Sequence, residues 1–429
     1  MIDAVPRRSA PVFLLLAFFS GVLLASPARS DGPGSPPGYG DLVGVPSPLR
    51  MVPTQLSAVA DGNLLIYRMP GIRGSEINAT AMLFTPKGPP PAGGWPVLVW
   101  GHGTVGWAPK CAPSVRLQEN GTWVDGHTDT LLAAVLRMGV AVIAPDYEGL
   151  GPVSAGVRPG HGYYDLSSEG SSMVFAVVAA QRDPGTRLSG QWVAAGWSEG
   201  GFAALAAAYY SGVAEKADPA LDYRGTVTFA PVPDIPAMNK VLWRDIADAS
   251  RPGSTPTEHE IDQLVFANAE TIYFTETERH AGYGVDPVQV YGPNMLKFYQ
   301  QNSQTCLDDL NAMVRKDIVD YLRASPSHRL GTYPGVRGDA PNSLPENSRF
   351  FTDNQGRLES STLPGPILWL FGTDDITSPA SVTYDVVNKM LTNGNDINLA
   401  VLAGAGHYDV PTAALPLVEA RLKTLFSLG

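Results

Sequence analysis

The sequence predicts an α/β protein with a mostly parallel sheet, flanked by helices and interrupted by an inserted helical segment. Three observations support this fold class. Apolar runs of about four to eight residues alternate with helical stretches over most of the chain. Residues 232–361 break this alternation and have helical character instead. The chain has 429 residues, of which 44% are hydrophobic and 17% are charged, and this is enough for one large domain with an insertion.

The first thirty residues have the order of a secretory signal peptide. Arg7 and Arg8 precede the apolar run 12–25, and small residues follow at 26–30. The run is shorter than the about 20 residues of a membrane-spanning helix. We therefore expect residues 1–30 to be removed and the protein to be secreted, or periplasmic or at the cell surface if the segment stays as an anchor. No other segment approaches a membrane span, and residues 31–50 are expected to form an extended leader rich in Gly and Pro.

Strands and helices alternate through residues 51–231, the first part of the predicted core. Continuous apolar runs such as 95–100, which ends in Gly-His-Gly, predict strands covered on both faces. Helical periodicity marks 128–137, and a long Ala- and Val-rich stretch marks 167–182. The expected strands are 63–68, 77–85, 95–100, 140–144, 191–196 and 225–230, and the helix after 191–196 reaches about residue 212.

The alternation stops at residue 232 and resumes at residue 362. Between them, 258–281 and 294–324 are expected to be helical, and 325–347 is rich in Pro, Gly and Asn. After the insertion we expect strands at 366–371 and 398–402 and helices near 380–391 and 413–428. The simplest partition is a core formed by 51–231 and 362–429, with 232–361 as a helical cap or lid.

A serine motif lies between a predicted strand and a predicted helix. Gly196-Trp-Ser-Glu-Gly200 fits G-x-S-x-G, whose small flanking residues allow a sharp turn that lifts the Ser198 hydroxyl above the sheet. Serine needs a base, and the base needs an orienting acid. In the fold that has this strand–turn–helix motif, the chain order is serine, acid, histidine. His407 is the one histidine of seven beyond the last long strand. Asp374 and Asp375 both follow the strand at 366–371 and compete as the acid.

A second loop follows the strand at 95–100. Gly101-His-Gly-Thr-Val-Gly106 can aim a backbone N–H at an oxyanion, together with the N–H of the residue after the serine. We assign these donors to Thr104 and Glu199. We expect His102 to shape the loop, since it lies upstream of the serine.

The chain has two cysteines, Cys111 and Cys306. In an oxidising compartment such a pair predicts a disulfide, and two buried thiols are the alternative. No metal site is predicted, since His259-Glu260 has Gln263 where the zinc motif needs a second histidine. The formal net charge of −11 gives no basic surface for nucleic acid.

Together these motifs resemble the secretory lipase family of α/β-hydrolases, the lipase-A-type secreted enzymes of fungi and bacteria. The resemblance implies carboxylic-ester hydrolysis through an acyl-enzyme, no cofactor, and a cap over an acyl-binding tunnel. The acid loop usual in that superfamily favours Asp375. The motifs are HGTVG at 102–106, CAPS at 111–114, APDYEGLG at 144–151, GWSEGG at 196–201, GTDD at 372–375 and GAGH at 404–407.

We therefore expect a secreted esterase or lipase that acts on an ester or lipid, including substrates at a lipid–water interface. The catalytic residues would be Ser198, Asp375 and His407, and the oligomeric state is left open. An acyltransferase or a peptidase on the same fold, or a binding module without catalysis, are the alternatives. The residues expected to contact substrate are Trp197, Phe266, Phe274 and Phe298.

Overall fold

The structure, a computed structural model, describes residues 38–428 except for 122, 124–126, 155–159, 302–304 and 339. The predicted signal peptide 1–30 and the first part of the leader, 31–37, lie outside the described residues. The described residues all belong to one compact unit. Within the described ranges, no helix combines the length and apolar character needed to cross a membrane.

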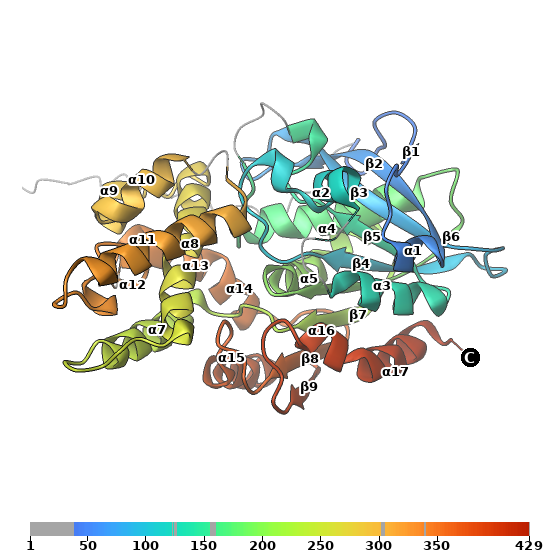
Figure 1. The fold of residues 1–429 in the computed structure, drawn as a ribbon. Coiled ribbons are helices and arrows are strands. Elements are labelled where there is room, and N and C mark those ends of the chain that lie inside the picture. The colour runs from blue at the N-terminus through green and yellow to red at the C-terminus, as the bar shows by residue number, and fades with distance from the viewer. Residues whose placement is uncertain are drawn as a thin grey trace, which may run out of the picture. The chain divides into compact units, whose positions relative to one another are not determined.

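A nine-stranded sheet forms the core (Figure 1). Its strand order is β1-β2-β3-β5-β4-β6-β7-β8-β9. The neighbours from β5 to β9 pair in parallel, whereas β1, β2 and β3 form an antiparallel end. The predicted α/β fold with a mostly parallel sheet is thus confirmed. The strands are β1 Ser47–Pro48, β2 Ala60–Pro70, β3 Glu76–Pro86, β4 Trp95–Gly101, β5 Ala141–Pro145, β6 Leu188–Trp197, β7 Asp222–Phe229, β8 Ile367–Gly372 and β9 Ile397–Leu402.

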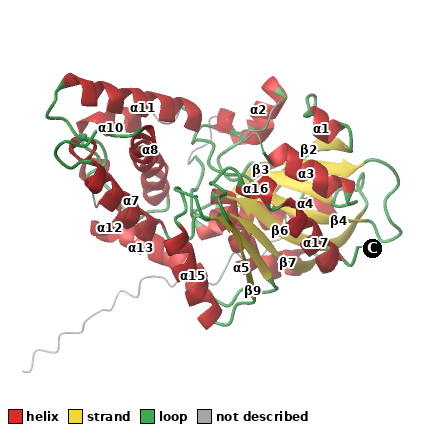
Figure 2. Ribbon diagram, turned by 60° about the horizontal axis from the view of Figure 1, so that its bottom comes forward, coloured by secondary structure: helices red, strands yellow, loops and turns green. Residues whose placement is uncertain are grey.

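Helices cover both faces of the sheet (Figure 2). In β4, Val97 and Val99 belong to one apolar cluster, and Leu98 and Trp100 belong to the other. This explains why the strand is a continuous apolar run, since side chains alternate between two buried faces. Helices α4 Leu166–Gln181, α5 Glu199–Tyr209 and α6 Ser211–Ala217 pack in the first cluster. The second contains α1 Thr54–Ser57, α2 Pro113–Asn120, α3 Thr128–Arg137, α16 Val410–Ala413 and α17 Leu415–Phe426.

The two ends of the sheet differ. At one end, residues 38–50 of the leader run along β2, where the N–H groups of Gly40 and Val43 donate to the carbonyls of Arg68 and Ile66. At the other end, β8 is the one described strand that pairs with β9, and all six residues of β9 are at least partly exposed. Helix α15 Ala380–Thr392 connects β8 to β9.

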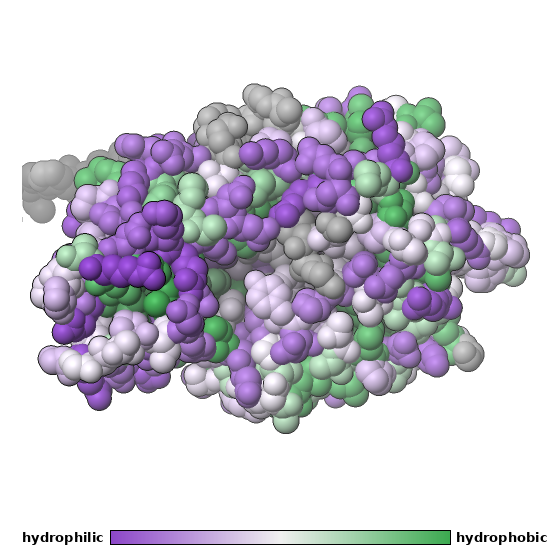
Figure 3. All heavy atoms as spheres, in the orientation of Figure 1, coloured by the Kyte–Doolittle hydropathy of each residue, from purple (hydrophilic) through white to green (hydrophobic). Residues whose placement is uncertain are grey.

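Helices fill the segment between β7 and β8. Its apolar side chains belong to the same cluster as one face of the sheet, so the insertion packs continuously on the core. On the face of the molecule that Figure 3 shows, polar side chains predominate at the surface. The helices are α7 Ile235–Ala249, α8 Glu258–His280, α9 Pro287–Val290, α10 Pro293–Gln301, α11 Leu307–Ala324, α12 Ala340–Ser343, α13 Pro345–Asp353 and α14 Gln355–Ser360.

Two expectations about the insertion need correction. The helical stretch predicted at 294–324 is two helices, α10 and α11. Cys306, between them, has an extended backbone and pairs with Gly106 outside the insertion, which a continuous helix would prevent. Helix α7 is not among the predicted elements, although it has a sequence signal. The Asp234 side chain accepts the N–H of Ala237 as an N-cap, and a proline lies in the first turn.

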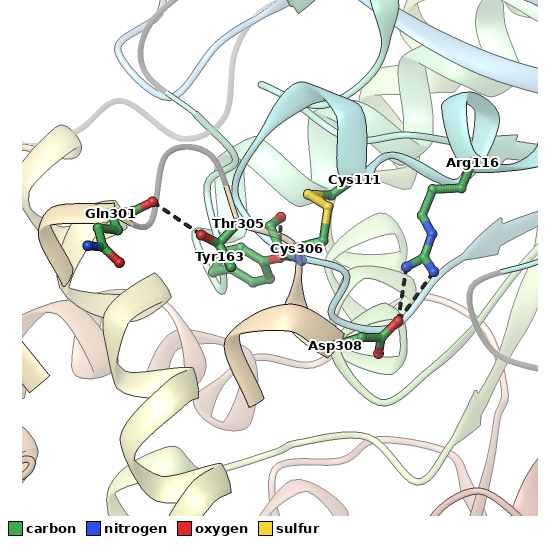
Figure 4. The surroundings of a disulfide bond; sticks show 8 residues. Cys111, Arg116, Tyr163, Gln301, Thr305, Cys306 and Asp308 are labelled. Atoms are coloured by element: carbon green, nitrogen blue, oxygen red, sulfur yellow. Dashed lines mark hydrogen bonds and ion pairs between the residues drawn. A yellow bond between two sulfur atoms is a disulfide. The ribbon is translucent and has the colours of Figure 1, made fainter. Parts of the chain in front are cut away.

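The predicted disulfide between Cys111 and Cys306 is present, with a Cα–Cα distance of 5.4 Å (Figure 4). Beside it, the N–H of Leu307 donates to the carbonyl of Val105 at 3.0 Å. An ion pair between Arg116 and Asp308, at 3.2 Å, joins the same two segments. The disulfide therefore ties the loop after β4 to the start of α11.

Candidate active site

The G-x-S-x-G segment forms a tight turn from β6 into α5. Ser198 has φ 59° and ψ −120°, a backbone conformation that non-glycine residues rarely adopt. The glycines on either side are needed for space. A Cβ on Gly196 would lie 2.0 Å from the carbonyl oxygen of Gly200, and a Cβ on Gly200 would lie 2.0 Å from that of Gly101. The turn therefore packs directly against the end of β4.

Ser198, His407 and Asp375 form one hydrogen-bonded chain. The Ser198 Oγ atom lies 2.9 Å from Nε2 of His407, and Nδ1 of His407 lies 2.7 Å from Oδ2 of Asp375. The other Asp375 oxygen accepts the N–H groups of Thr377 and Ser378. Because Nδ1 faces a carboxylate, it carries the hydrogen, and Nε2 is left to accept the serine proton.

The two competing aspartates occupy different environments. Asp375 is buried and contacts His407, whereas Asp374 is exposed and accepts a hydrogen bond from the Thr373 hydroxyl.

Trp197, predicted to contact substrate, lies beside His407. Its indole N–H donates to the carbonyl of His407 at 3.0 Å, and the two rings are 5.1 Å apart. Trp197 is thus placed to hold the histidine loop.

The loop after β4 lies against the same turn. A Cβ on Gly103 would lie 2.7 Å from the Trp197 ring, so this glycine allows close approach. His102 is buried, its ring nitrogens face the carbonyls of Gly103 and Asp146, and its ring lies 4.2 Å from that of Tyr147. Burial lowers the pKa of His102. Both ring nitrogens of His102 therefore face backbone carbonyls, which agrees with a role in shaping the loop.

The two assigned oxyanion donors belong to the start of α5 and to the loop after β4. Glu199 is the first residue of α5, where N–H groups have no acceptor within the helix. Thr104 lines the same pocket as Ser198. The N-terminus of a helix also favours negative charge. The arrangement offers a position for an anionic oxygen beside the serine.

A pocket lined by Ser198 and by residues of α7 and α8 has about 620 Å³ of empty space, including the part that is open to solvent. The pocket is mainly apolar, with several polar groups among the apolar side chains. Phe266 and Phe274, both predicted to contact substrate, line it, whereas Trp197 and Phe298 do not. The remaining lining residues, apart from Thr104 and Ser198, are Tyr164, Val232, Ile235, Met238, Asn239, Val241, Leu242, Asp245, Gln263, Ala267, Glu270, Thr271, Ile376, Thr377 and Pro379.

Buried acidic groups gather beside the serine, and no local pattern in the sequence indicates them. Glu199 and Glu169 are fully buried, and Glu270 is 6% exposed. Burial raises the pKa of Glu199 and of Glu270 to about 8, and it raises the pKa of Glu169 as well. The Thr104 hydroxyl faces the carboxyl groups of Glu199 and Glu270. Burial therefore favours the neutral form of these acids.

His161 joins this group. One ligand atom each from His161, Glu169 and Glu199 lies within 4.8 Å of the others, a combination that can bind a cation. However, Nε2 of His161 and Oε1 of Glu199 are 2.5 Å apart. This is a hydrogen-bond distance, whereas two ligands of one cation at about 2.1 Å lie about 3 Å or more from each other. We interpret the contact as a hydrogen bond rather than as metal ligation.

The sheet order, the turn at Ser198 and the helical insertion define an α/β-hydrolase fold, and comparison with solved structures agrees. An esterase LipA from Xanthomonas oryzae, described as degrading the rice cell wall, superimposes with a TM-score of 0.65 at 19% identity, covering 92% of this chain and 100% of that one. Candida antarctica lipase A in its closed state gives 0.65 at 15% identity, covering 91% and 82%. No protein-family model and no curated protein sequence matches the chain. At the level of the fold, the predicted resemblance to lipase-A-type proteins is confirmed.

Proposed function

We propose that the protein is a carboxylic-ester hydrolase that works through an acyl-enzyme on Ser198. The observation that carries the proposal is the chain of hydrogen bonds Ser198–His407–Asp375, whose serine lines a pocket. The lipase and esterase folds of the structural neighbours support the same class of reaction.

In the proposed mechanism, the Ser198 oxygen attacks the ester carbonyl carbon while Nε2 of His407 takes the serine proton. Asp375 holds Nδ1–H and stabilises the imidazolium. The backbone N–H groups of Thr104 and Glu199 bind the oxyanion, and His407 then gives its proton to the leaving alcohol. In the second half of the reaction water takes the place of the alcohol. His407 takes a proton from the water as it attacks the acyl-enzyme and then returns a proton to Ser198, which releases the carboxylic acid.

The apolar lining of the pocket suits the acyl group of an ester substrate. Phe266 and Phe274 contribute aromatic surface, and each buried CH₂ of an acyl chain can gain about 0.8 kcal/mol. Ile376 lines the pocket and is 42% exposed, so apolar surface continues outward beside Asp375. We therefore propose lipids or apolar esters as substrates, with Phe266 and Phe274 in the acyl-binding wall.

The domain assignment and the export route belong to the same proposal. Residues 232–361 would act as a cap on the core formed by 51–231 and 362–429, since α7 and α8 frame the pocket. Residues 1–30 would direct secretion. The disulfide between Cys111 and Cys306 supports an oxidising compartment.

A panel of chromogenic esters of increasing acyl length, assayed with wild type and Ser198→Ala, tests the proposal. The variant should lose on the order of 10⁴-fold or more in kcat. Ser211→Ala is the matched control, because Ser211 is buried in α6 and does not line the pocket. A fluorophosphonate should label wild type but not Ser198→Ala. Full activity of Ser198→Ala would refute the assignment.

Product analysis separates the alternatives. If added alcohols replaced water as the main acyl acceptor, the protein would be an acyltransferase. Faster cleavage of matched amides than of esters would make it a peptidase. A wild-type protein that binds the esters without turnover and does not react with the fluorophosphonate would be a binding module.

A further inference from the structure

The residue after Ser198 has a side chain that the proposed mechanism does not use. Only the backbone N–H of Glu199 is assigned to the oxyanion. Its carboxyl group is fully buried and lies 2.5 Å, Oε1 to Nε2, from His161, which is also buried. A buried acid in this position needs an explanation, because burying it in charged form would be costly.

The hydrogen bonds of His161 determine where the proton of this pair lies. Its Nδ1 atom is 3.1 Å from the backbone carbonyl of Glu148, which can only accept, so Nδ1 carries a hydrogen. In a neutral imidazole Nε2 then accepts, and the contact requires a hydrogen on the carboxyl group of Glu199. Burial favours this neutral pair, since it raises the pKa of Glu199 to about 8 and lowers that of His161 to about 3.

The side chain of His161 is held in place by its neighbours. Its ring stacks on Tyr147 with centroids 5.2 Å apart and planes 11° apart, and it meets Tyr163 edge-on at 4.2 Å. The carbonyl of His161 accepts the indole N–H of Trp107 at 3.0 Å. A side chain bonded to this ring is therefore anchored, and through it the first turn of α5 is anchored too.

We propose that Glu199 is a positioning residue of the oxyanion hole: as a neutral acid bonded to His161, it fixes the first backbone N–H of α5 and keeps negative charge away from the oxyanion. This inference rests on the proposed function. Thr104, the other assigned donor, has its hydroxyl facing Glu199 and Glu270, so both donor residues share one buried network.

Other titratable groups face Glu199 from each element packed against it. Two are acids, one on α4 and one on α8, and they oppose a negative charge on Glu199. The titratable groups that face Glu199 are His102, Tyr147, His161, Tyr163, Tyr164, Glu169, Glu270 and Tyr273.

Ionisation of Glu199 should slow the proposed reaction. When Glu199 loses its proton as the pH rises, its negative charge lies one residue from the serine and opposes the developing oxyanion, so kcat should fall.

The test is kcat and KM for a short chromogenic ester between pH 6 and 10. In wild type we expect kcat to fall with an apparent pKa near 8. Glu199→Ala should lower kcat about 10- to 100-fold at pH 7, because the backbone donor is misplaced. KM should change by less than about 2-fold, because the side chain of Glu199 does not line the pocket. Glu199→Gln, whose amide can donate to Nε2, should recover most of the loss in kcat and lack the alkaline decline.

Two variants act as controls. Glu278→Gln makes the same chemical change at a buried glutamate of α8 that does not line the pocket, and it should keep the wild-type pH profile. Glu270→Gln changes the acid that shares the Thr104 hydroxyl with Glu199; because Glu270 lines the pocket, its KM can change, but the alkaline decline in kcat should remain.

The inference is overturned if Glu199→Ala has wild-type kcat, or if Glu199→Gln keeps the alkaline decline. Should Glu199→Ala not fold, the pH profile of Glu199→Gln decides by itself. A wild-type protein that hydrolyses no ester would instead count against the proposed function, so the two failures are distinct.

Discussion

Removing the disulfide is a perturbation whose effect can be calculated from the structure. The bond joins cysteines 195 residues apart, and a closed loop of this length removes chain entropy from the unfolded state worth about 5 kcal/mol at 25 °C. The folded state keeps other links between the same segments, including the hydrogen bond from Leu307 to Val105. We therefore expect the loss to act mainly through the unfolded chain.

The double variant Cys111→Ala/Cys306→Ala should have a free energy of unfolding lower than that of wild type by about 3–5 kcal/mol. Urea unfolding followed by intrinsic fluorescence and linear extrapolation gives this quantity. Wild type unfolded under reducing conditions should match the double variant. Arg116→Ala is a useful comparison, since its partly exposed ion pair with Asp308 should be worth less than about 1 kcal/mol.

A double variant within about 1 kcal/mol of wild type would refute the reasoning about the unfolded chain. Mass spectrometry of unreduced wild type that finds two free thiols would refute the bond itself.

Further predictions concern the acid, the pocket and the pH dependence of stability. Asp375→Asn should lower kcat on the order of 10⁴-fold, as in serine triads generally, whereas Asp374→Asn should change it little; equal losses in the ester assay would refute this. Phe266→Ala should shift the preferred acyl length, whereas Phe298→Ala, outside the pocket, should not, as an ester panel would reveal. Between about pH 5 and 8 the free energy of unfolding should fall as the pH rises, by up to about 1.4 kcal/mol per pH unit for each carboxyl whose pKa is raised to about 8, because the folded state keeps a proton that the unfolded chain releases. Urea unfolding at several pH values should show a smaller slope for Glu199→Gln, whose residue 199 no longer contributes a pKa near 8.

Elements with strong local constraints can be predicted from the sequence. The turn at Ser198 is specified by Gly196 and Gly200, because any side chain there would collide with backbone atoms, and the flanking apolar strands are buried on both faces. The two cysteines allow either a disulfide or two thiols, and the structure has the disulfide. The break before α11 depends on the pairing of Cys306 with Gly106, which lies far away in the chain and gives no local signal.

The site shows the same limit. Asp374 and Asp375 are neighbours of identical chemistry, and only the tertiary arrangement decides that Asp375 contacts His407. Asp375 is further held by two backbone N–H groups that follow it, a pattern compatible with many loops. His161 and Glu199 meet through the packing of distant segments, so no motif connects them.

The free side of β9 affects how the protein behaves at high concentration. The outer backbone N–H and C=O groups of Ile397–Leu402 have no neighbouring strand among the described residues, and the segment carries neither charge nor proline, the usual means of blocking edge-to-edge pairing. The opposite end of the sheet closes with a strand of only two residues that includes Pro48. Intermolecular strand addition should therefore begin at β9. Val401→Lys, at a position that is 43% exposed, is the substitution we would choose to keep concentrated samples in solution.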